Sequence, residues 1–295
     1  MSGWRKVADR ISVVVISRNE GKELKRTVEN FDDTLPAGCE IIVIDDGSTD
    51  GSASTVAKRR GRIKLHRVEG YGVARARNFG ARQALGDVIV YADAHLRLEP
   101  DWWRPMVDVL QNPRVGGVAP AIAGYRPGPI GYGLTFKDSK LEVRWLRHRP
   151  RGLIAAPIIP GCCFATRRDV IEATGGWDAG QLQRGNIDNE GCVRFWMLGY
   201  DLMITPETIV AHKFRKRSPY HVGWPEFLYN RLRLAFVHFN PQRLGQVVAA
   251  LRNYPGFGEA LALLAASDIA ERRREIDARR IRDDNWYCKR FNMFW

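Results

Sequence analysis

The segment "VIVYADAHLRLEPDWW" at residues 88–103 ends an apolar run with Asp93 and His95, a pair that could hold a metal ion. Residues two apart on a β-strand share a face, so the carboxylate and the imidazole point the same way. Carboxylates suit Mn²⁺ and Mg²⁺, and an imidazole shifts the preference toward transition metals, so the mixture favours Mn²⁺, with Mg²⁺ possible. Two protein ligands are too few. His212, which ends a later apolar run before a cluster of Lys and Arg, is the best candidate for a third.

Acidic residues mark two further candidate sites, each with an ordinary structural interpretation beside it. Asp45 and Asp46 close the apolar run "EIIVI" and could accept hydrogen bonds from a nucleobase or from ribose hydroxyls, or could form a turn or helix cap. Asp188 and Glu190 open a helical segment and could orient an acceptor hydroxyl or act as a base, or could cap that helix. Each histidine taken singly is more often a surface or core residue than a ligand.

Alternating strands and helices must position these residues. The pattern predicts strands at 11–17, 63–69 and 86–95, and a strand at 40–52 that closes on acidic and small turn residues. Helices are predicted at 19–31, 51–60 and 72–85. Such alternation favours a parallel sheet of βαβ units, in which ligands bind beyond the carboxyl ends of the strands. A strand and helix at 157–178, helices at 188–200 and 225–239, and a strand running from 202 into a basic loop follow. The Gly- and Pro-rich stretch 116–133 indicates a loop or a sheet edge.

Composition fits a well-packed α/β protein with a basic surface. The chain has 295 residues, 45% hydrophobic and 27% charged, enough for a full core. A net charge of +13 favours polyanionic partners such as nucleotide phosphates, nucleic acid or acidic lipid, although an Arg-rich proteome would give the same balance. The five cysteines have no zinc-site spacing, and the adjacent pair Cys162-Cys163 in an apolar context favours reduced core packing over a disulfide, which indicates a reducing compartment. Because no apolar run could span a membrane and no leader is recognisable, we expect a cytoplasmic protein.

Several ordered segments resemble a nucleotide-sugar glycosyltransferase of the GT-A fold, and within it the catalytic domain of polypeptide N-acetylgalactosaminyltransferases. The segments are "SVVVISRNE", "EIIVIDDGS", "GVARARNFGA", "DAHLRLEPDWW", "GCCFATRRDVIEATGGWDAG", "EGCVRFWMLGYDLMITP" and "AHKFRKRSPY". The resemblance implies an α/β, Rossmann-like fold with a mostly parallel central sheet flanked by helices. We expect a GT-A catalytic domain over residues 1–240 and a C-terminal helical extension over 241–295 that packs on it.

Residue by residue, the resemblance implies a role for each matched position. Asp93 and His95 match the family's Asp-x-His metal ligands, and His212 matches its distant third ligand. Asp45 or Asp46 matches the carboxylate that binds uridine. Arg75 or Arg77 matches an arginine near the donor, and Arg215 and Tyr220 match a mobile loop that closes over the nucleotide sugar. The residues placed at the nucleotide are therefore Arg18, Asp45, Asp46, Arg75, Arg77, Asp93, Ala94 and Tyr220, and those placed at the chemistry are Asp188, Glu190 and Arg215.

Two departures from the family pattern bear on specificity. Where the family has Trp-Gly-Gly-Glu-Asn, this chain has Arg184-Gly185-Asn186-Ile187-Asp188, so the family's sugar-contacting Glu falls on Ile187 unless Asp188 substitutes for it. The family's His-Asn-Glu becomes Arg18-Asn19-Glu20, which changes the nucleotide pocket. We expect no counterpart of the family's membrane anchor or of its lectin domain.

The sequence therefore predicts an Mn²⁺-dependent glycosyltransferase that moves a sugar, HexNAc or hexose, from a UDP-sugar to a hydroxyl of a macromolecular acceptor. Retention of configuration follows the family, whereas a base such as Asp188 would suit inversion. The acceptor is open: a protein or peptide hydroxyl, DNA carrying hydroxymethylated pyrimidines of the kind found in phages, or a cell-envelope glycan. Basic stretches at 136–152, 213–217 and 271–282 would form a DNA track if they shared a face. A non-catalytic binding protein on the same scaffold is the alternative from another class.

Overall fold

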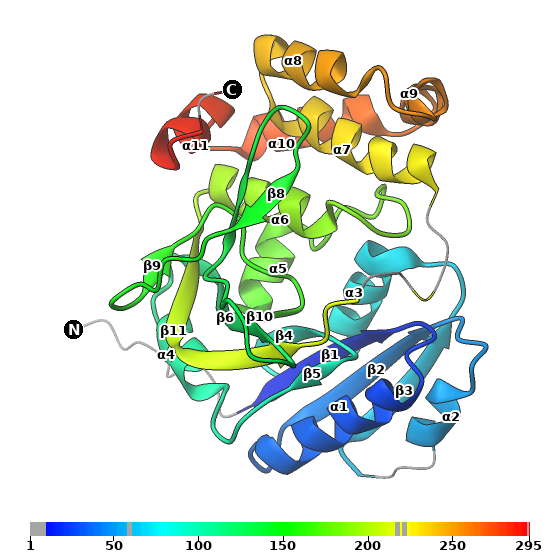
Figure 1. Cartoon of the computed structure of the whole chain (residues 1–295), viewed down its shortest axis with the longest axis vertical. Coiled ribbons are helices and arrows are strands. Elements are labelled where there is room, and N and C mark those ends of the chain that lie inside the picture. Colours follow the sequence, from blue (N-terminus) through cyan, green and yellow to red (C-terminus); the bar gives the residue numbers. More distant parts are fainter. Residues whose placement is uncertain (1–9, 58–60, 216–218, 220–222, 294) are drawn as a thin grey trace.

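A nine-stranded sheet organises the part of the chain that the computed structural model describes, residues 10–57, 61–215, 219, 223–293 and 295 (Figure 1). Its main path runs β3 (Ile63–Val68), β2 (Glu40–Asp46), β1 (Ile11–Ser17), β4 (Val88–Asp93), β10 (Cys163–Arg167), β6 (Val115–Gly124), β11 (Asp201–His212) and β5 (Leu96–Arg97). The short strand β9 (Ile154–Ala155) pairs with β11, and β7 (Leu134–Phe136) and β8 (Val143–Trp145) form a separate hairpin.

The first four strands are parallel, as their spacing in the sequence predicts. β1 pairs in parallel with both β2 and β4, and β2 pairs in parallel with β3. β10 then runs antiparallel to both of its neighbours, while β11 is parallel to β6. The β-branched runs of β1 and β2 are buried on both faces, which is typical of strands covered by helices on each side. The predicted α/β fold with a mostly parallel central sheet is therefore confirmed.

Helices cover both faces of this sheet. Val13 and Val15 of β1 face a core shared with α1 (Lys22–Thr34), α2 (Ser52–Ala57) and α4 (Arg104–Leu110). Val14, between them, faces the opposite core, which is shared with α3 (Gly72–Gln83), α5 (Arg168–Thr174) and α6 (Ile187–Met197). Alternation along one strand thus separates the two layers, and the carboxyl ends of β1, β2 and β4 are left at one edge of the sheet.

The stretch expected to be a loop or sheet edge is instead partly a central strand, so that expectation is wrong for Val115–Gly124. A Cβ at Gly116 would lie 2.5 Å from Cβ of Tyr200, so glycine there permits close packing rather than a turn. Pro120 cannot donate to a ladder, and its partner Thr205 lies at the start of a register shift in β11. Small residues and the neighbouring bulge therefore let a Gly- and Pro-containing segment occupy the interior of the sheet.

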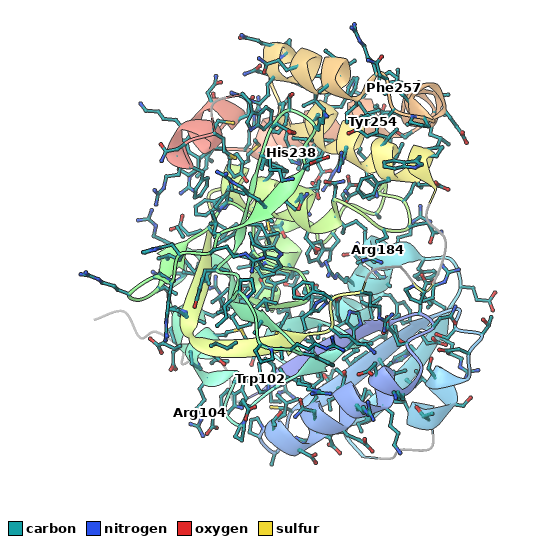
Figure 2. All side chains as sticks on the ribbon, in the orientation of Figure 1. Trp102, Arg104, Arg184, His238, Tyr254 and Phe257 are labelled. Carbon is teal, nitrogen blue, oxygen red and sulfur yellow. The ribbon has the colours of Figure 1, made fainter. Side chains whose placement is uncertain are left out.

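Five C-terminal helices form a further layer beyond α6 (Figure 1). They are α7 (Trp224–His238), α8 (Pro241–Leu251), α9 (Phe257–Ala265), α10 (Ile269–Arg279) and α11 (Asp284–Arg290). Leu251, Leu264 and Tyr287 belong to the same apolar cluster as Val14 of β1, and side chains fill the space between the layers (Figure 2). Among the described residues, no helix is both long enough and apolar enough to cross a membrane.

Candidate functional site

The structure brings the three predicted metal ligands together. Asp93 ends β4 and His95 lies two residues further on, while β5 pairs with β11 so that His212 stands opposite Leu96. One ligand atom from each side chain lies within 4.8 Å of the others. Asp93 Oδ2 is 3.2 Å from His212 Nε2 and 3.8 Å from His95 Nε2. Residues 119 positions apart in the chain therefore converge on one point.

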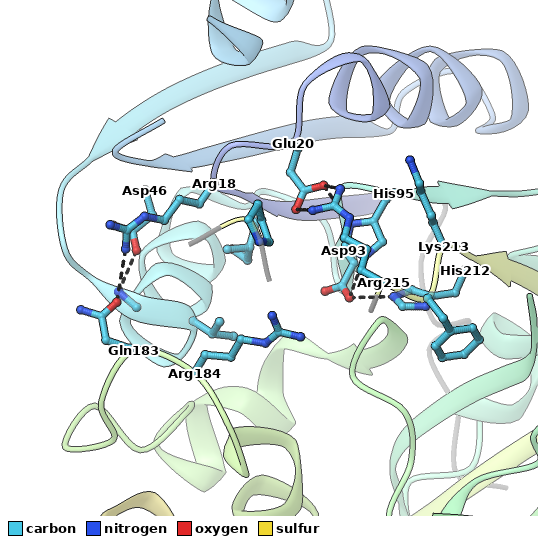
Figure 3. A pocket seen from close by; sticks show the side chains of 15 residues that line it. Arg18, Glu20, Asp46, Asp93, His95, Gln183, Arg184, His212, Lys213 and Arg215 are labelled. Atoms are coloured by element: carbon cyan, nitrogen blue, oxygen red, sulfur yellow. Dashed lines mark hydrogen bonds and ion pairs between the residues drawn. The ribbon is translucent and has the colours of Figure 1, made fainter. Parts of the chain in front are cut away.

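Glu20, three residues beyond the end of β1, orients this cluster from the other side. Its Oε2 lies 3.0 Å from His95 Nδ1, and both of its oxygens contact the guanidinium of Arg215 (Figure 3). A histidine whose Nδ1 is held by a carboxylate presents Nε2 to a metal, and such outer contacts fix the tautomer and ring orientation of metal-bound histidines. Glu20 is only 9% exposed, so this contact is shielded from water.

The donor set fits a divalent transition metal. One carboxylate and two imidazole nitrogens converge, a mixture that favours a transition metal such as Mn²⁺ over Mg²⁺ or Ca²⁺. Burial raises the pKa of Asp93, but its hydrogen bond with His212 and the nearby positive charges outweigh that effect and hold the pKa well below its usual range. Asp93 is thus ionised at neutral pH, as a ligand must be.

A cavity of about 230 Å³ opens beside the cluster (Figure 3). It is lined by Ile16, Arg18, Glu20, Asp46, Gly72, Val73, Asp93, His95, Gln183, Arg184, His212, Lys213, Phe214, Arg215 and Pro219. Lys213 and Arg215 follow β11 on one wall, and Arg184 reaches in from the facing wall. The cavity therefore combines a metal-ligand cluster with cationic side chains, a combination suited to a phosphorylated ligand.

Asp46 lies at the other end of the cavity, and both sequence interpretations apply to it. Its two oxygens accept hydrogen bonds from the backbone N–H groups of Tyr71 and Gly72, each at 2.8 Å, at the start of α3. The same carboxylate lines the cavity, so Asp46 both anchors the start of α3 and borders the cavity. Asp45 is also buried, but it does not line the cavity, and its nearest ionic partner is Arg67 at 3.9 Å.

The two candidate arginines of α3 point in different directions. Arg75 is exposed and donates to the carbonyl of Ala179, so it does not border the cavity. Arg77 is buried, stacks over Trp177 at 4.4 Å and pairs with Asp188 at 2.5 Å. Residues two positions apart on a helix point about 200° away from each other. Arg75 and Arg77 therefore cannot both face the interior of the protein.

Asp188 connects to the metal cluster through the segment at 161–162. Arg77 donates to Asp188 and to the carbonyl of Gly161, and the next carbonyl, that of Cys162, accepts from Asp93 N–H at 2.9 Å. A Cβ on Gly161 would lie 1.9 Å from Asp188 Oδ1, so only glycine permits this approach. The side chain of Asp188 is 38% exposed, and it can therefore meet a substrate.

Glu190 has a different role from the one expected. It is fully buried, pairs with Arg194 at 2.9 Å and contacts His238 Nε2 at 2.9 Å. Burial raises its pKa, but the charge of Arg194 and the contact with His238 hold that pKa well below its usual range. Enclosed in this network, Glu190 cannot reach an acceptor, and we correct its assignment from a candidate base to a structural ion pair.

One other expected position does not line the cavity, and some residues without an expected role do. Ala94 is fully buried in the core on the α1 side, and Tyr220 lies outside the described residues. Glu20 and Arg184 were noted in the sequence only within departures from the family pattern, and Gln183 was not singled out, yet all three line the cavity. Glu20 could have been found by the signal that identified Asp45 and Asp46, an acidic residue just beyond a buried strand. Gln183 and Arg184 lie in an irregular segment with no such signal.

Comparison with known sequences places this site in context. Residues 12–175 match the model of the family described as Glycosyl transferase family 2. Polypeptide N-acetylgalactosaminyltransferase 11 of Xenopus tropicalis is 33% identical over 255 residues, which cover 77% of this chain and 42% of that protein. N-acetylgalactosaminyltransferase 7 of Drosophila melanogaster is 30% identical over 241 residues, which cover 72% of this chain and 41% of that protein. The chain thus spans about two fifths of the length of these relatives.

Solved structures share the fold. The crystal structure of GalNAc-T7 with UDP, GalNAc and Mn²⁺ matches with a TM-score of 0.75 and 22% identity, covering 95% of this chain and 56% of that one. The mannosyltransferase PcManGT from Pyrobaculum calidifontis, in complex with GDP-Man and Mn²⁺, matches with a TM-score of 0.54 and 21% identity, covering 96% of this chain and 83% of that one.

Proposed function

Because this chain belongs to glycosyl transferase family 2, we propose that it transfers a sugar from a UDP-sugar to a hydroxyl of a macromolecular acceptor. The resemblance to polypeptide N-acetylgalactosaminyltransferases is confirmed by the sequence matches. The observation that supports the proposal most directly is the convergence of Asp93, His95 and His212 at the edge of a cavity bordered by Asp46. A cluster of candidate metal ligands and a carboxylate that can meet a nucleoside thus border one crevice, near the carboxyl ends of parallel strands.

Charged residues of this chain surround the place where a diphosphate would lie. Asp93, His95 and His212 would hold Mn²⁺, which supplies charge neutralisation for a departing nucleoside diphosphate. Lys213 and Arg215 lie on the β11 wall, and Arg184 reaches in from the other wall. These cations would stabilise the negative charge that develops as the bond to the anomeric carbon breaks. Arg215 contacts Glu20 in this structure, and we propose that it turns toward the diphosphate when the donor binds.

We place the transferred sugar between Asp93 and Asp188, against the backbone of Gly161 and Cys162. Arg77 donates a hydrogen bond to Oδ1 of Asp188. We propose that the other oxygen, Oδ2, accepts a hydrogen bond from a hydroxyl of the sugar or of the acceptor. Ile187, the position matched to the family's sugar-contacting Glu, is buried in the core instead. Asp188 is therefore our candidate for the residue that reads the sugar, and N-acetylhexosamine is our first candidate for the sugar itself.

Retention of anomeric configuration is the stereochemical course we propose. A carboxylate held by Arg77 is placed to orient hydroxyl groups, and front-face attack needs no enzyme nucleophile. Proton NMR of the product distinguishes the two outcomes directly, because α- and β-linked sugars differ in their anomeric couplings. A β-linked product from an α-linked donor would assign Asp188 the role of a base and overturn retention.

A protein or peptide hydroxyl is the acceptor we propose, because the matched relatives are named as polypeptide N-acetylgalactosaminyltransferases. The DNA alternative gains no support from the basic stretch at 271–282. Its arginines pair with acidic residues close by, as Arg274 does with Glu271 and Arg279 with Glu275, so the helix presents little unbalanced charge. A cell-envelope glycan is retained as an outcome of the experiment below.

UDP release tests this function. The chain is incubated with single UDP-sugars in the presence and absence of Mn²⁺, and products are identified by mass analysis against a peptide pool, envelope glycans and hydroxymethylated DNA. We expect Mn²⁺-dependent UDP release and mass added to peptides, with His95→Ala and His212→Ala abolishing both. UDP release that persists in these variants, or no release with any UDP-sugar, would refute the proposal.

A further inference from the structure

The segment 178–186 forms part of the cavity wall although it has no regular structure. Gln183 and Arg184 line the cavity, and Arg184 extends into it (Figure 3). Gln183 and Asn186 both have left-handed backbones, with φ of 34° and 57°, and Gly185 between them has φ of 101°. Non-glycine residues adopt this region only where their surroundings hold them there. Something outside the segment must therefore fix its shape.

Asn230 of α7 provides that fixation. Its side chain is fully buried and accepts a hydrogen bond from Leu182 N–H at 2.8 Å. The same amide donates to the carbonyls of Leu182 at 2.7 Å, Gly185 at 2.9 Å and Arg184 at 3.3 Å. One side chain thus binds the backbone on both sides of Gln183. A buried amide with these contacts specifies one loop conformation, since any other would leave its polar atoms unpartnered.

Two more residues of α7 hold the beginning of the segment. Tyr229 donates its hydroxyl hydrogen to the carbonyl of Gly180 at 2.9 Å, and Arg233 binds both oxygens of Asp178 at 2.7 and 2.8 Å. A Cβ on Gly180 would lie 2.2 Å from Arg233 Nη2, so the two elements are in close contact. Tyr229 and Arg233 are one helical turn apart, so one side of α7 contacts the segment along its length.

The far side of the segment is held against α3. The carbonyl of Gln183 accepts from Val73 N–H at 2.9 Å, and its side chain accepts from Arg18 at 3.3 Å. Gly72 lies so close that a Cβ there would be 2.9 Å from Cα of Gln183. Gln183 therefore lies between α7 and the end of the cavity where Asp46 holds α3.

We propose that Asn230 is a positioning residue for donor binding, because it holds Leu182–Gly185 so that Gln183 and Arg184 form a preorganised wall of the cavity. This rests on the proposed function, in which the cavity binds a nucleoside diphosphate. A loop fixed before binding spares the donor the entropic cost of ordering it, so loss of the brace weakens donor binding and leaves the metal ligands untouched.

Binding of UDP to the full chain in the presence of Mn²⁺ tests the proposal by calorimetry. Asn230→Asp keeps the acceptor for Leu182 N–H but removes the donors to the carbonyls. We expect its UDP affinity to fall by about 10-fold or more, since several buried hydrogen bonds are lost. We expect Mn²⁺ binding, followed by electron paramagnetic resonance without UDP, to be unchanged. Hydrogen exchange should accelerate at residues 180–186 and remain unchanged in β11.

Leu232→Ala is the matched control, because Leu232 is equally buried on α7 but apolar. It should lower the Tm and leave UDP affinity unchanged. Asn230→Ser, which is smaller and uncharged, provides the same comparison if the aspartate variant does not fold. Equal UDP affinity in the Asn230 variants, or an equal loss in Leu232→Ala, would overturn the inference. No UDP binding by the unaltered chain would refute the proposed function as well, while hydrogen exchange would still decide whether Asn230 holds the loop.

Discussion

Glu20 links three features of the site, the end of β1, the His95 ring and the Arg215 guanidinium. A carboxylate in this position raises the basicity of a ligating imidazole and fixes the nitrogen it presents. Its contact with Arg215 also holds one cation beside the cavity. The orientation of His95 therefore depends on Glu20, and Glu20 also contacts Arg215. Only the fold brings these three residues together.

Glu20→Gln should weaken Mn²⁺ binding by about 10- to 100-fold, the usual effect of removing a carboxylate that orients a metal-bound histidine. Calorimetric titration with Mn²⁺ measures this directly. Glu23→Gln is the control, since Glu23 pairs with Lys213 at 3.0 Å and has no contact with either histidine among those described. Equal Mn²⁺ affinity in Glu20→Gln and the unaltered chain would show that Glu20 does not orient His95.

Gly161→Ala should separate sugar positioning from nucleotide binding. The added methyl group would occupy the place of Asp188 Oδ1 and force that carboxylate away from Arg77. Misplacement of a positioning group by about 1 Å can lower the rate about 100-fold. We expect kcat for transfer to fall on that scale while UDP affinity stays within about twofold. A full loss of UDP binding would contradict the placement of Asp188 at the sugar rather than at the nucleotide.

At the scale of elements, α6, α7 and α10 are joined by a buried ionic network. Glu190 and Arg194 come from α6, His238 from α7, and Arg272 from α10. Burial lowers the pKa of His238, and its contact with Glu190 only partly offsets this. His238 is therefore neutral in the folded protein at neutral pH, while it titrates near 6.5 in the unfolded chain.

Stability should consequently fall as the pH drops below about 6.5. A group whose folded pKa is depressed binds protons preferentially in the unfolded state, so acid favours unfolding until the folded pKa is reached. The slope contributed by His238 is at most about 1.4 kcal/mol per pH unit. Urea unfolding between pH 7.5 and 5 measures it. His238→Gln should flatten this part of the curve. Parallel curves for the unaltered chain and His238→Gln would contradict the assignment.

At the scale of the whole molecule, the C-terminal helices and the sheet share one core. Leu228, Leu232 and Phe239 have no exposed surface, and the apolar cluster that contains them extends to Leu251, Leu264 and Tyr287. The Tyr287 hydroxyl also donates to the carbonyl of Pro157 at 3.1 Å, which ties α11 to the central part of the chain. We therefore propose that the segment 241–295, expected to be an extension of the catalytic domain, folds with it as one unit.

Removal of residues 241–295 should then abolish cooperative folding rather than leave an intact domain of 240 residues. The truncation would expose to water the apolar side chains of α7 that are buried in the full chain. Large exposed apolar patches destabilise a soluble fold and favour aggregation. Thermal unfolding followed by circular dichroism should show one transition for the full chain and none for the truncated chain, with increased binding of a hydrophobic dye. A truncated chain with an unchanged Tm would show that the C-terminal helices are a separate unit.

The sequence by itself determined the alternating order of the first strands and helices, because each apolar run between turn residues is long enough to be read locally. It also indicated the candidate metal ligands, since Asp93 and His95 follow one apolar run and His212 ends another. Tertiary structure alone decided that Asp46 rather than Asp45 lines the cavity, and that Arg77 rather than Arg75 is buried, where it pairs with Asp188. Both outcomes depend on which face of each element is covered. It also placed β6 inside the sheet, enclosed Glu190, and brought Gln183 and Arg184 to the cavity through Asn230. These outcomes depend on contacts between distant segments, which local patterns do not record.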